Sequence, residues 1–96
     1  MPFQSASQMR LCYARLADDL CHGRAPQWDC ESWYHETPDP NCLPERVGDE
    51  VRCRRPAPET GVQVGPRGGI YVVRGGRTIY FPRDCPELRN YLAQDR

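Results

Sequence analysis

The sequence predicts a small, irregular α+β protein organised around a β-hairpin. Two β-rich runs, 70–74 and 77–81, are separated only by Gly75-Gly76, and a two-residue turn of this kind needs positive φ angles that glycine adopts readily. An apolar stripe with helical spacing follows residue 5, and ten prolines and eight glycines interrupt the 96 residues. We expect one domain with four parts: an N-terminal helix pair (1–38), a proline-rich extended strap (39–59), the hairpin module (60–83) and a short C-terminal helix (84–96).

The N-terminal part is predicted to be helical because it carries both a start signal and a helical period. Ser5 and Gln8 have the spacing of a capping box, and Gly23 can end the helix. Between them, apolar residues recur at steps of three and four: Met9, Cys12, Tyr13, Leu16, Ala17 and Leu20. A second, shorter helix is expected from Pro26 to about Glu36, before the stop signal at 37–40.

The strap shows no hydrophobic period, so we expect it to run across the helices in extended form, with Cys42 and Cys53 pinning it. After the hairpin, Asp84 is the predicted N-cap of the last helix. Leu88 and Leu92 share one face of that helix. Because an isolated two-stranded hairpin is barely stable in water, we expect these leucines to cover its apolar face.

A type I′ turn would place Arg74 opposite Arg77 and so fix the pairing of the whole hairpin. Side chains alternate along a strand, which puts one apolar set on the core face: Ile70, Val72, Ile79 and Phe81. Two like charges directly opposite each other repel, and this favours an anion or an acidic partner at the tip. The alternative is a solvated turn whose arginines only add solubility.

Arginine is concentrated in the hairpin module although the whole chain is neutral. Thirteen arginines balance thirteen acids and lysine is absent, yet residues 60–83 contain four arginines and no acid. The planar guanidinium group suits bidentate pairing with carboxylate or phosphate, and glycine-rich turns can present backbone N–H groups to an anion. The predicted partner-binding or anion-binding residues are Arg67, Gly68, Gly69, Arg74, Gly75, Gly76, Arg77 and Arg83.

Six cysteines in so short a chain need a structural role: Cys12, Cys21, Cys30, Cys42, Cys53 and Cys85. Disulfides are the favoured role because a small core gains about 2–4 kcal/mol from each long loop that is closed, although the spacing does not reveal the pairing. One alternative is a zinc site with a loose ligand set: Cys21, His22, Cys30, His35 and Cys42. Buried free thiols are the other. No cofactor is expected.

The run Gly65-Pro66-Arg67-Gly68-Gly69-x-Tyr71, followed by a glycine turn, a basic residue and Tyr80, resembles the small basic adaptor domain of chlorella viruses and other large double-stranded DNA viruses. The resemblance covers residues 60–83. It implies a module that tethers its carrier to viral DNA or to virion structures, in a virus that forms its own disulfides. The chain departs from that family in having no lysine.

These observations favour a non-enzymatic viral structural protein. The chain has no phosphate-binding loop, no H-E-x-x-H motif and no recognisable nucleophile elbow. The leading expectation is a minor capsid or cement component that binds neighbouring virion proteins through the arginine-tipped hairpin and the strap. One alternative is a nucleic-acid tether that binds phosphate through four arginines: Arg67, Arg74, Arg77 and Arg83. The other is a zinc-stabilised interaction module.

The N-terminus lacks the apolar segment of a signal peptide, and no run in the sequence approaches the length of a membrane span. We therefore expect a protein that is made in the host cytoplasm, is not secreted, and resides in the virion.

Overall fold

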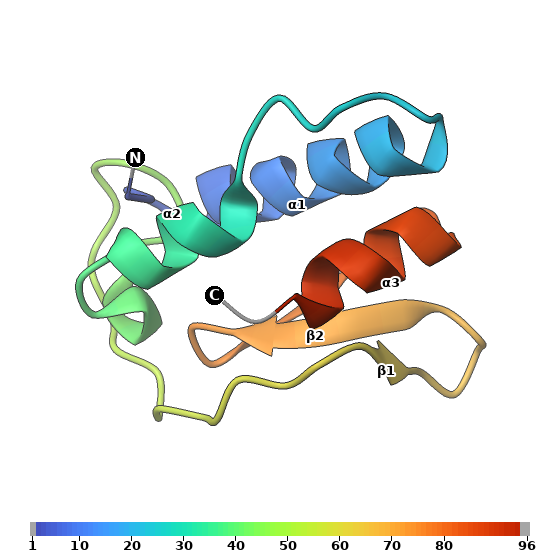
Figure 1. Cartoon of the computed structure of the whole chain (residues 1–96). Helices are drawn as coiled ribbons and strands as arrows, with labels where there is room; N and C mark the ends of the chain where they lie inside the picture. Colours follow the sequence, from blue (N-terminus) through green and yellow to red (C-terminus); the bar gives the residue numbers. More distant parts are fainter. Residues whose placement is uncertain (1, 95–96) are drawn as a thin grey trace.

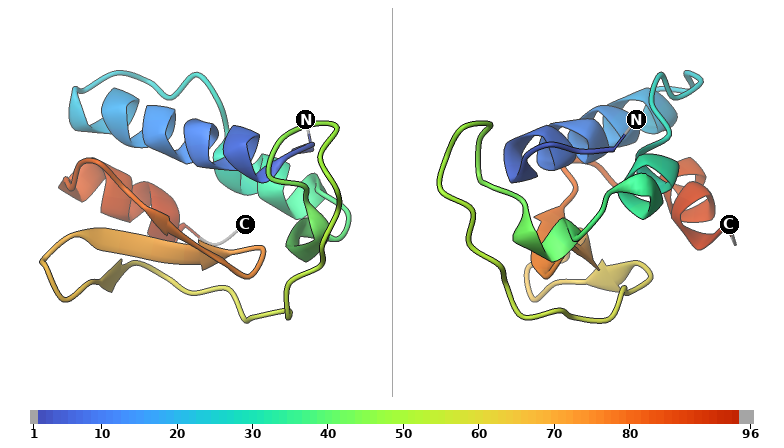
Figure 2. Two further views of the ribbon diagram at one scale, coloured as in Figure 1. Left: turned by 180° about the vertical axis from the view of Figure 1, so that it is seen from behind. Right: turned by 90° about the vertical axis from the view of Figure 1, so that its left-hand side faces the viewer.

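Residues 2–94 are described by a computed structural model, and they fold into three α-helices beside a three-stranded antiparallel sheet (Figure 1). The elements in chain order are α1 (Ala6–Cys21), α2 (Cys30–Glu36), the 3₁₀ helix η1 (Pro40–Cys42), β1 (Gln63–Val64), β2 (Ile70–Arg74), β3 (Arg77–Tyr80) and α3 (Pro86–Ala93). The three α-helices lie on one side of the sheet (Figure 1, Figure 2). Within residues 2–94, no helix combines the length and the hydropathy that crossing a membrane requires. The predicted α+β class is confirmed.

α1 begins where the sequence predicts because its first N–H groups find acceptors. The N–H of Gln8 donates to Ser5 Oγ at 3.1 Å, and the N–H groups of Ala6 and Ser7 donate to carbonyl oxygens of the strap at 2.8 and 3.0 Å. The predicted stripe faces inward, where Leu20 is partly buried and the remaining members are fully buried: Met9, Cys12, Tyr13, Leu16 and Ala17. This face of α1 forms one wall of the core.

α2 is shorter than predicted. It begins at Cys30 rather than near Pro26, and Asp29 is its N-cap. The Asp29 carboxylate accepts the N–H of Ser32 at 3.4 Å. An aspartate at this position satisfies one of the free N–H groups of the first turn, which moves the start four residues past the proline.

α3 also starts differently from the prediction, although its packing is as expected. Its N-cap is Cys85 and not Asp84. The Asp84 carboxylate instead accepts two hydrogen bonds from Arg89, at 2.6 and 2.8 Å. Leu88 and Leu92 are buried in the same core as the inner face of the hairpin, so the predicted cover is confirmed.

β2 and β3 pair in the predicted register, with Arg74 opposite Arg77 at the turn. Gly75 and Gly76 have φ angles of 61° and 71°, as a type I′ turn requires. β3 ends at Tyr80, one residue earlier than predicted. The four residues predicted for the inner face are all buried: Ile70, Val72, Ile79 and Phe81.

The hairpin turn is covered by the strap and does not project into solvent. A Cβ atom on Gly75 would lie 2.6 Å from the carbonyl oxygen of Pro40, and one on Gly76 would lie 3.0 Å from that of Arg55. Glycine is therefore needed at both positions for close packing as well as for the turn itself. The strap continues from there to β1, a third strand that the sequence analysis did not predict and that pairs with β2 (Figure 2).

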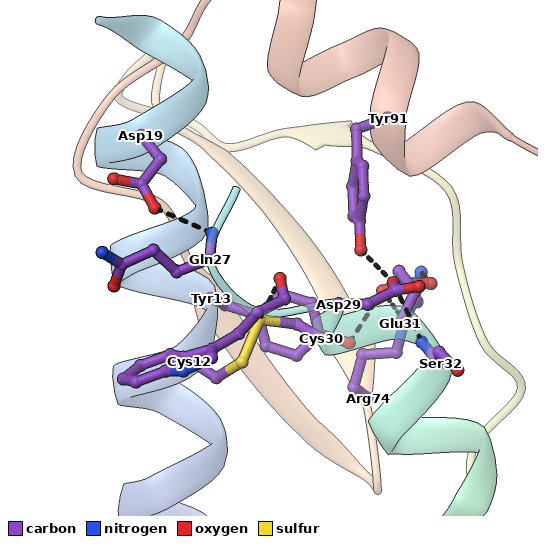
Figure 3. The surroundings of a disulfide bond; sticks show 11 residues. Cys12, Tyr13, Asp19, Gln27, Asp29, Cys30, Glu31, Ser32, Arg74 and Tyr91 are labelled. Carbon is purple, nitrogen blue, oxygen red and sulfur yellow. Dashed lines mark hydrogen bonds and ion pairs between the residues drawn. A yellow bond between two sulfur atoms is a disulfide. The ribbon is translucent and has the colours of Figure 1, made fainter. Parts of the chain in front are cut away.

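All six cysteines form disulfides, which confirms the favoured role. The pairs are Cys12–Cys30, Cys21–Cys85 and Cys42–Cys53. Cys12–Cys30 joins α1 to the start of α2 (Figure 3). Cys21–Cys85 joins the end of α1 to the residue before α3, and Cys42–Cys53 closes a loop within the strap. The two alternatives, free thiols and a cysteine-bound zinc, are not realised.

Removing the Cys21–Cys85 disulfide is expected to cost more stability than removing Cys42–Cys53. The sequence separations are 64 and 11 residues, and loop-closure entropy then predicts losses of about 4 and about 3 kcal/mol. Urea unfolding of the two paired Cys→Ser variants measures this order. The reverse order would show that strain or residual structure outweighs chain entropy.

Candidate binding surfaces

Arg74 is buried inside the protein and is not presented at the hairpin tip. Its side chain is 4% exposed and forms a two-point ion pair with Glu31 of α2, with Nε–Oε1 at 3.1 Å and Nη2–Oε2 at 3.2 Å. Nη1 donates to the carbonyl oxygens of Thr60 and Val73 at 2.6 and 2.8 Å. The guanidinium group is thus satisfied by the chain itself, which corrects the expectation of an open arginine pair awaiting an external anion.

The ion pair belongs to a buried polar network that joins three elements. The Tyr13 hydroxyl of α1 donates to Glu31 Oε1 at 2.7 Å (Figure 3). The Tyr34 ring lies 5.9 Å from the Arg74 guanidinium carbon, and the Tyr34 hydroxyl accepts the N–H of Gly75 at 3.0 Å. Burial, together with the charge and hydrogen bond of Glu31, raises the pKa of Tyr13 far above its usual value, so this phenol is a permanent donor.

Two other predicted arginines also pair internally. Arg77 Nη1 lies 3.1 Å from the Glu45 carboxylate, and only 12% of the Arg77 side chain is exposed. Arg83 lies 3.5 Å from the Asp18 carboxylate at the surface. The repulsion expected between Arg74 and Arg77 is therefore relieved by two different glutamates of the same chain.

Arg67 differs from the other three predicted arginines. It is exposed, and among residues 2–94 no carboxylate forms an ion pair with it. It lies in the turn between β1 and β2, where the N–H of Gly65 donates to the Gly69 carbonyl at 2.7 Å and the N–H of Gly68 donates to the Gly65 carbonyl at 3.0 Å. The N–H of Gly68, one of the residues predicted to bind an anion, is thus used within the turn. The charge of Arg67 has no carboxylate partner within residues 2–94.

The turn between β1 and β2 is at the end of the sheet opposite the hairpin tip (Figure 1). A pocket lies beside this turn. The Tyr71 and Tyr80 rings, 5.4 Å apart, pack over Gly65, where a Cβ would come within 3.8 Å of both. Tyr80 is 62% exposed. We call this the Tyr80 pocket; its volume is about 360 Å³ and it is lined by Gly65, Pro66, Arg67, Gly69 and Tyr80.

β3 is the edge strand beside this pocket. It pairs only with β2 within residues 2–94. Arg74 and Arg77 flank the turn, and the N–H of Phe81 donates to the Ile70 carbonyl at 3.1 Å. In an antiparallel ladder, hydrogen-bonded and non-hydrogen-bonded pairs alternate, so the N–H and C=O groups of Thr78 and Tyr80 point away from β2. An extended segment of another protein can hydrogen bond to that edge.

The five residues of the predicted zinc set are not brought together. Cys21, Cys30 and Cys42 belong to three different disulfides and have no thiolate to offer. His22 Nδ1 is 2.7 Å from the Asp18 carbonyl oxygen, and His35 faces Glu59 at 3.8 Å. In the part of the chain that the structure describes, no group of three potential metal ligands is found.

The sequence did not single out Glu31, the residue whose carboxylate pairs with buried Arg74. Nothing in its local pattern distinguishes it, because surface glutamates are common in the first turn of a helix. Comparisons of the chain with family models, curated proteins and solved structures gave no match. The resemblance of residues 60–83 to the basic adaptor domain therefore stays a prediction from the motif.

The buried ion pair predicts a large effect of one isosteric change. Glu31→Gln leaves the Arg74 charge buried without its carboxylate, so we expect a loss of about 3–5 kcal/mol in urea unfolding. Glu50→Gln is the matched control, because its pair with Arg52 is exposed and 3.7 Å long, and we expect less than about 1 kcal/mol. Similar losses in the two variants would contradict a special role for Glu31.

The raised pKa of Tyr13 predicts loss of stability in alkali. The unfolded chain loses the Tyr13 proton near pH 10 while the folded protein keeps it. The contribution of Tyr13 to the free energy of unfolding is therefore intact below about pH 10 and declines as the pH rises further. Tyr13→Phe should make the fall of the free energy of unfolding with pH less steep above pH 10, by up to about 1.4 kcal/mol per pH unit. Parallel curves for the two proteins would show that Tyr13 does not set this dependence.

Proposed function

We propose that the protein is a non-enzymatic structural adaptor that docks onto a neighbouring protein through the Tyr80 pocket. The observation that supports this proposal is the combination found there: a largely exposed aromatic ring, an apolar lining and the charge of Arg67, which pairs with no carboxylate of residues 2–94. Tyrosine and arginine are, with tryptophan, the side chains enriched among the residues that dominate the energy of protein–protein interfaces.

The chemistry of the pocket indicates what the partner presents. An apolar side chain fills the space beside Tyr80, and an acidic group next to it pairs with Arg67. The open edge of β3 can align an extended segment through main-chain hydrogen bonds. The partner is therefore a protein with an exposed, acidic and partly apolar strand.

The three disulfides support a place of action outside a reducing compartment. Together with the motif resemblance, they lead us to propose a virion component, made in the host cytoplasm and incorporated as a minor capsid or cement protein. A small protein that is cross-linked three times keeps its shape in a released particle without depending on its core alone.

A nucleic-acid tether receives less support. A phosphate-binding surface needs arginines that lie side by side and are free to pair. Arg74 is buried, Arg77 and Arg83 have carboxylate partners, and Arg67 stands apart. The four arginines predicted to contact phosphate thus do not form one surface.

Incorporation into particles tests the proposed function. Tagged protein should be found by mass spectrometry in purified particles of the virus that encodes it. Tyr80→Ser should lower the incorporated amount about tenfold or more, and Arg67→Gln several-fold, because each removes an anchor of the interface. Arg24→Gln is the control, since Arg24 is exposed and lies on the connection after α1.

Unfolding of each variant is measured beside incorporation, so that loss of the fold is not mistaken for loss of docking. Absence of the wild-type protein from particles would overturn the proposal. Tight, salt-sensitive binding of a labelled DNA duplex, lost in Arg67→Gln, would favour the tether instead.

A further inference from the structure

A second hollow lies at the other end of β3, between the loop closed by Cys42–Cys53 and the hairpin turn. Its volume is about 340 Å³. The charged side chains that line it are Glu45, Glu50, Arg52, Arg54 and Arg77. We call it the strap pocket. It shares no residue with the Tyr80 pocket.

The charges around the strap pocket do not balance. Glu45 is shared between two arginines, because one of its oxygens pairs with Arg10 and the other with Arg77. Arg52 pairs only loosely with Glu50, at 3.7 Å. Arg54 forms no ion pair within residues 2–94. Three arginines and two glutamates line the pocket, and Arg10 also pairs with one of these glutamates, so positive charge is in excess there.

The pKa of Arg77 is lowered in these surroundings. Its partial burial and the nearby positive charges of Arg54 and Arg10 lower its pKa, even though Glu45 is in contact with it. An anion in the pocket would relieve this repulsion. The Glu45 carboxylate opposes such an anion, but it is held by Arg10 and Arg77.

The main chain that carries Arg54 is fixed. Its N–H donates to the Asn41 carbonyl at 2.8 Å, and its own carbonyl accepts the Asn41 side-chain amide at 3.0 Å. The Cys42–Cys53 disulfide lies directly beside these bonds. Gly76 packs so closely that a Cβ there would lie 3.3 Å from the Arg54 Cβ. The pocket is thus built on a rigid frame, which lowers the entropy cost of binding.

We propose that the strap pocket binds a doubly charged phosphate group, held by Arg54 and Arg77 with Arg52 at its rim. The negative charge of the ligand complements the excess of positive charge around the pocket. Guanidinium groups pair with phosphate oxygens through short, charge-assisted hydrogen bonds. This site is independent of docking through the Tyr80 pocket.

Calorimetric titration of the full chain with inorganic phosphate tests the proposal, with sodium chloride at the same ionic strength as the blank. Arg54→Gln should weaken phosphate binding about tenfold, because it removes one charge-assisted contact. Arg67→Gln removes an equal charge outside the pocket and should change binding less than about twofold. Glu45→Gln should strengthen binding, because it removes one of the two carboxylates that line the pocket.

A parallel titration with glycerol phosphate distinguishes the source of the ligand. Binding of both probes would identify a phosphate group carried by a larger molecule, and binding of inorganic phosphate alone would identify the free ion. Absence of saturable binding would overturn the proposal. Equal weakening by Arg54→Gln and Arg67→Gln would also overturn it, because general screening and not the pocket would then explain the effect.

Discussion

The buried ion pair between Arg74 and Glu31 is the constraint on which the rest of this structure depends. A charge removed from water is tolerated only when its partners are close and complete, and Arg74 has a carboxylate and two carbonyl oxygens around it. To reach Glu31, the hairpin has to lie with its tip against α2. The Tyr13 hydroxyl also donates to Glu31, so the same buried network fixes how α1, α2 and β2 pack against one another.

That arrangement decides which surfaces remain open. The hairpin tip is closed by α2 and by the strap, whose carbonyl oxygens lie against Gly75 and Gly76. The opposite end of the sheet carries the Tyr80 pocket, and the loop closed by Cys42–Cys53 carries the strap pocket. In a chain of this size the core is small, and the three disulfides hold α1, α2, α3 and the strap in place around it.

Local features of the sequence predicted local structure well. The glycine pair at 75–76 and the alternation of the flanking residues predicted the hairpin, its register and its buried face. The spacing of Ser5 and Gln8 and the apolar stripe predicted α1. The start of α2 was predicted wrongly because a proline can open a helix but does not have to, and β1 was missed because two residues carry too little pattern.

The sequence by itself determined where the chain turns, which strand residues face inward, and that its cysteines are available for cross-links. Only the tertiary structure decided which cysteines pair and which arginines stay free. The reason is that helix and strand signals act between neighbours in the chain, whereas Arg74 and Glu31 are 43 residues apart. Their meeting, and with it the burial of one arginine and the exposure of another, follows from how the elements pack.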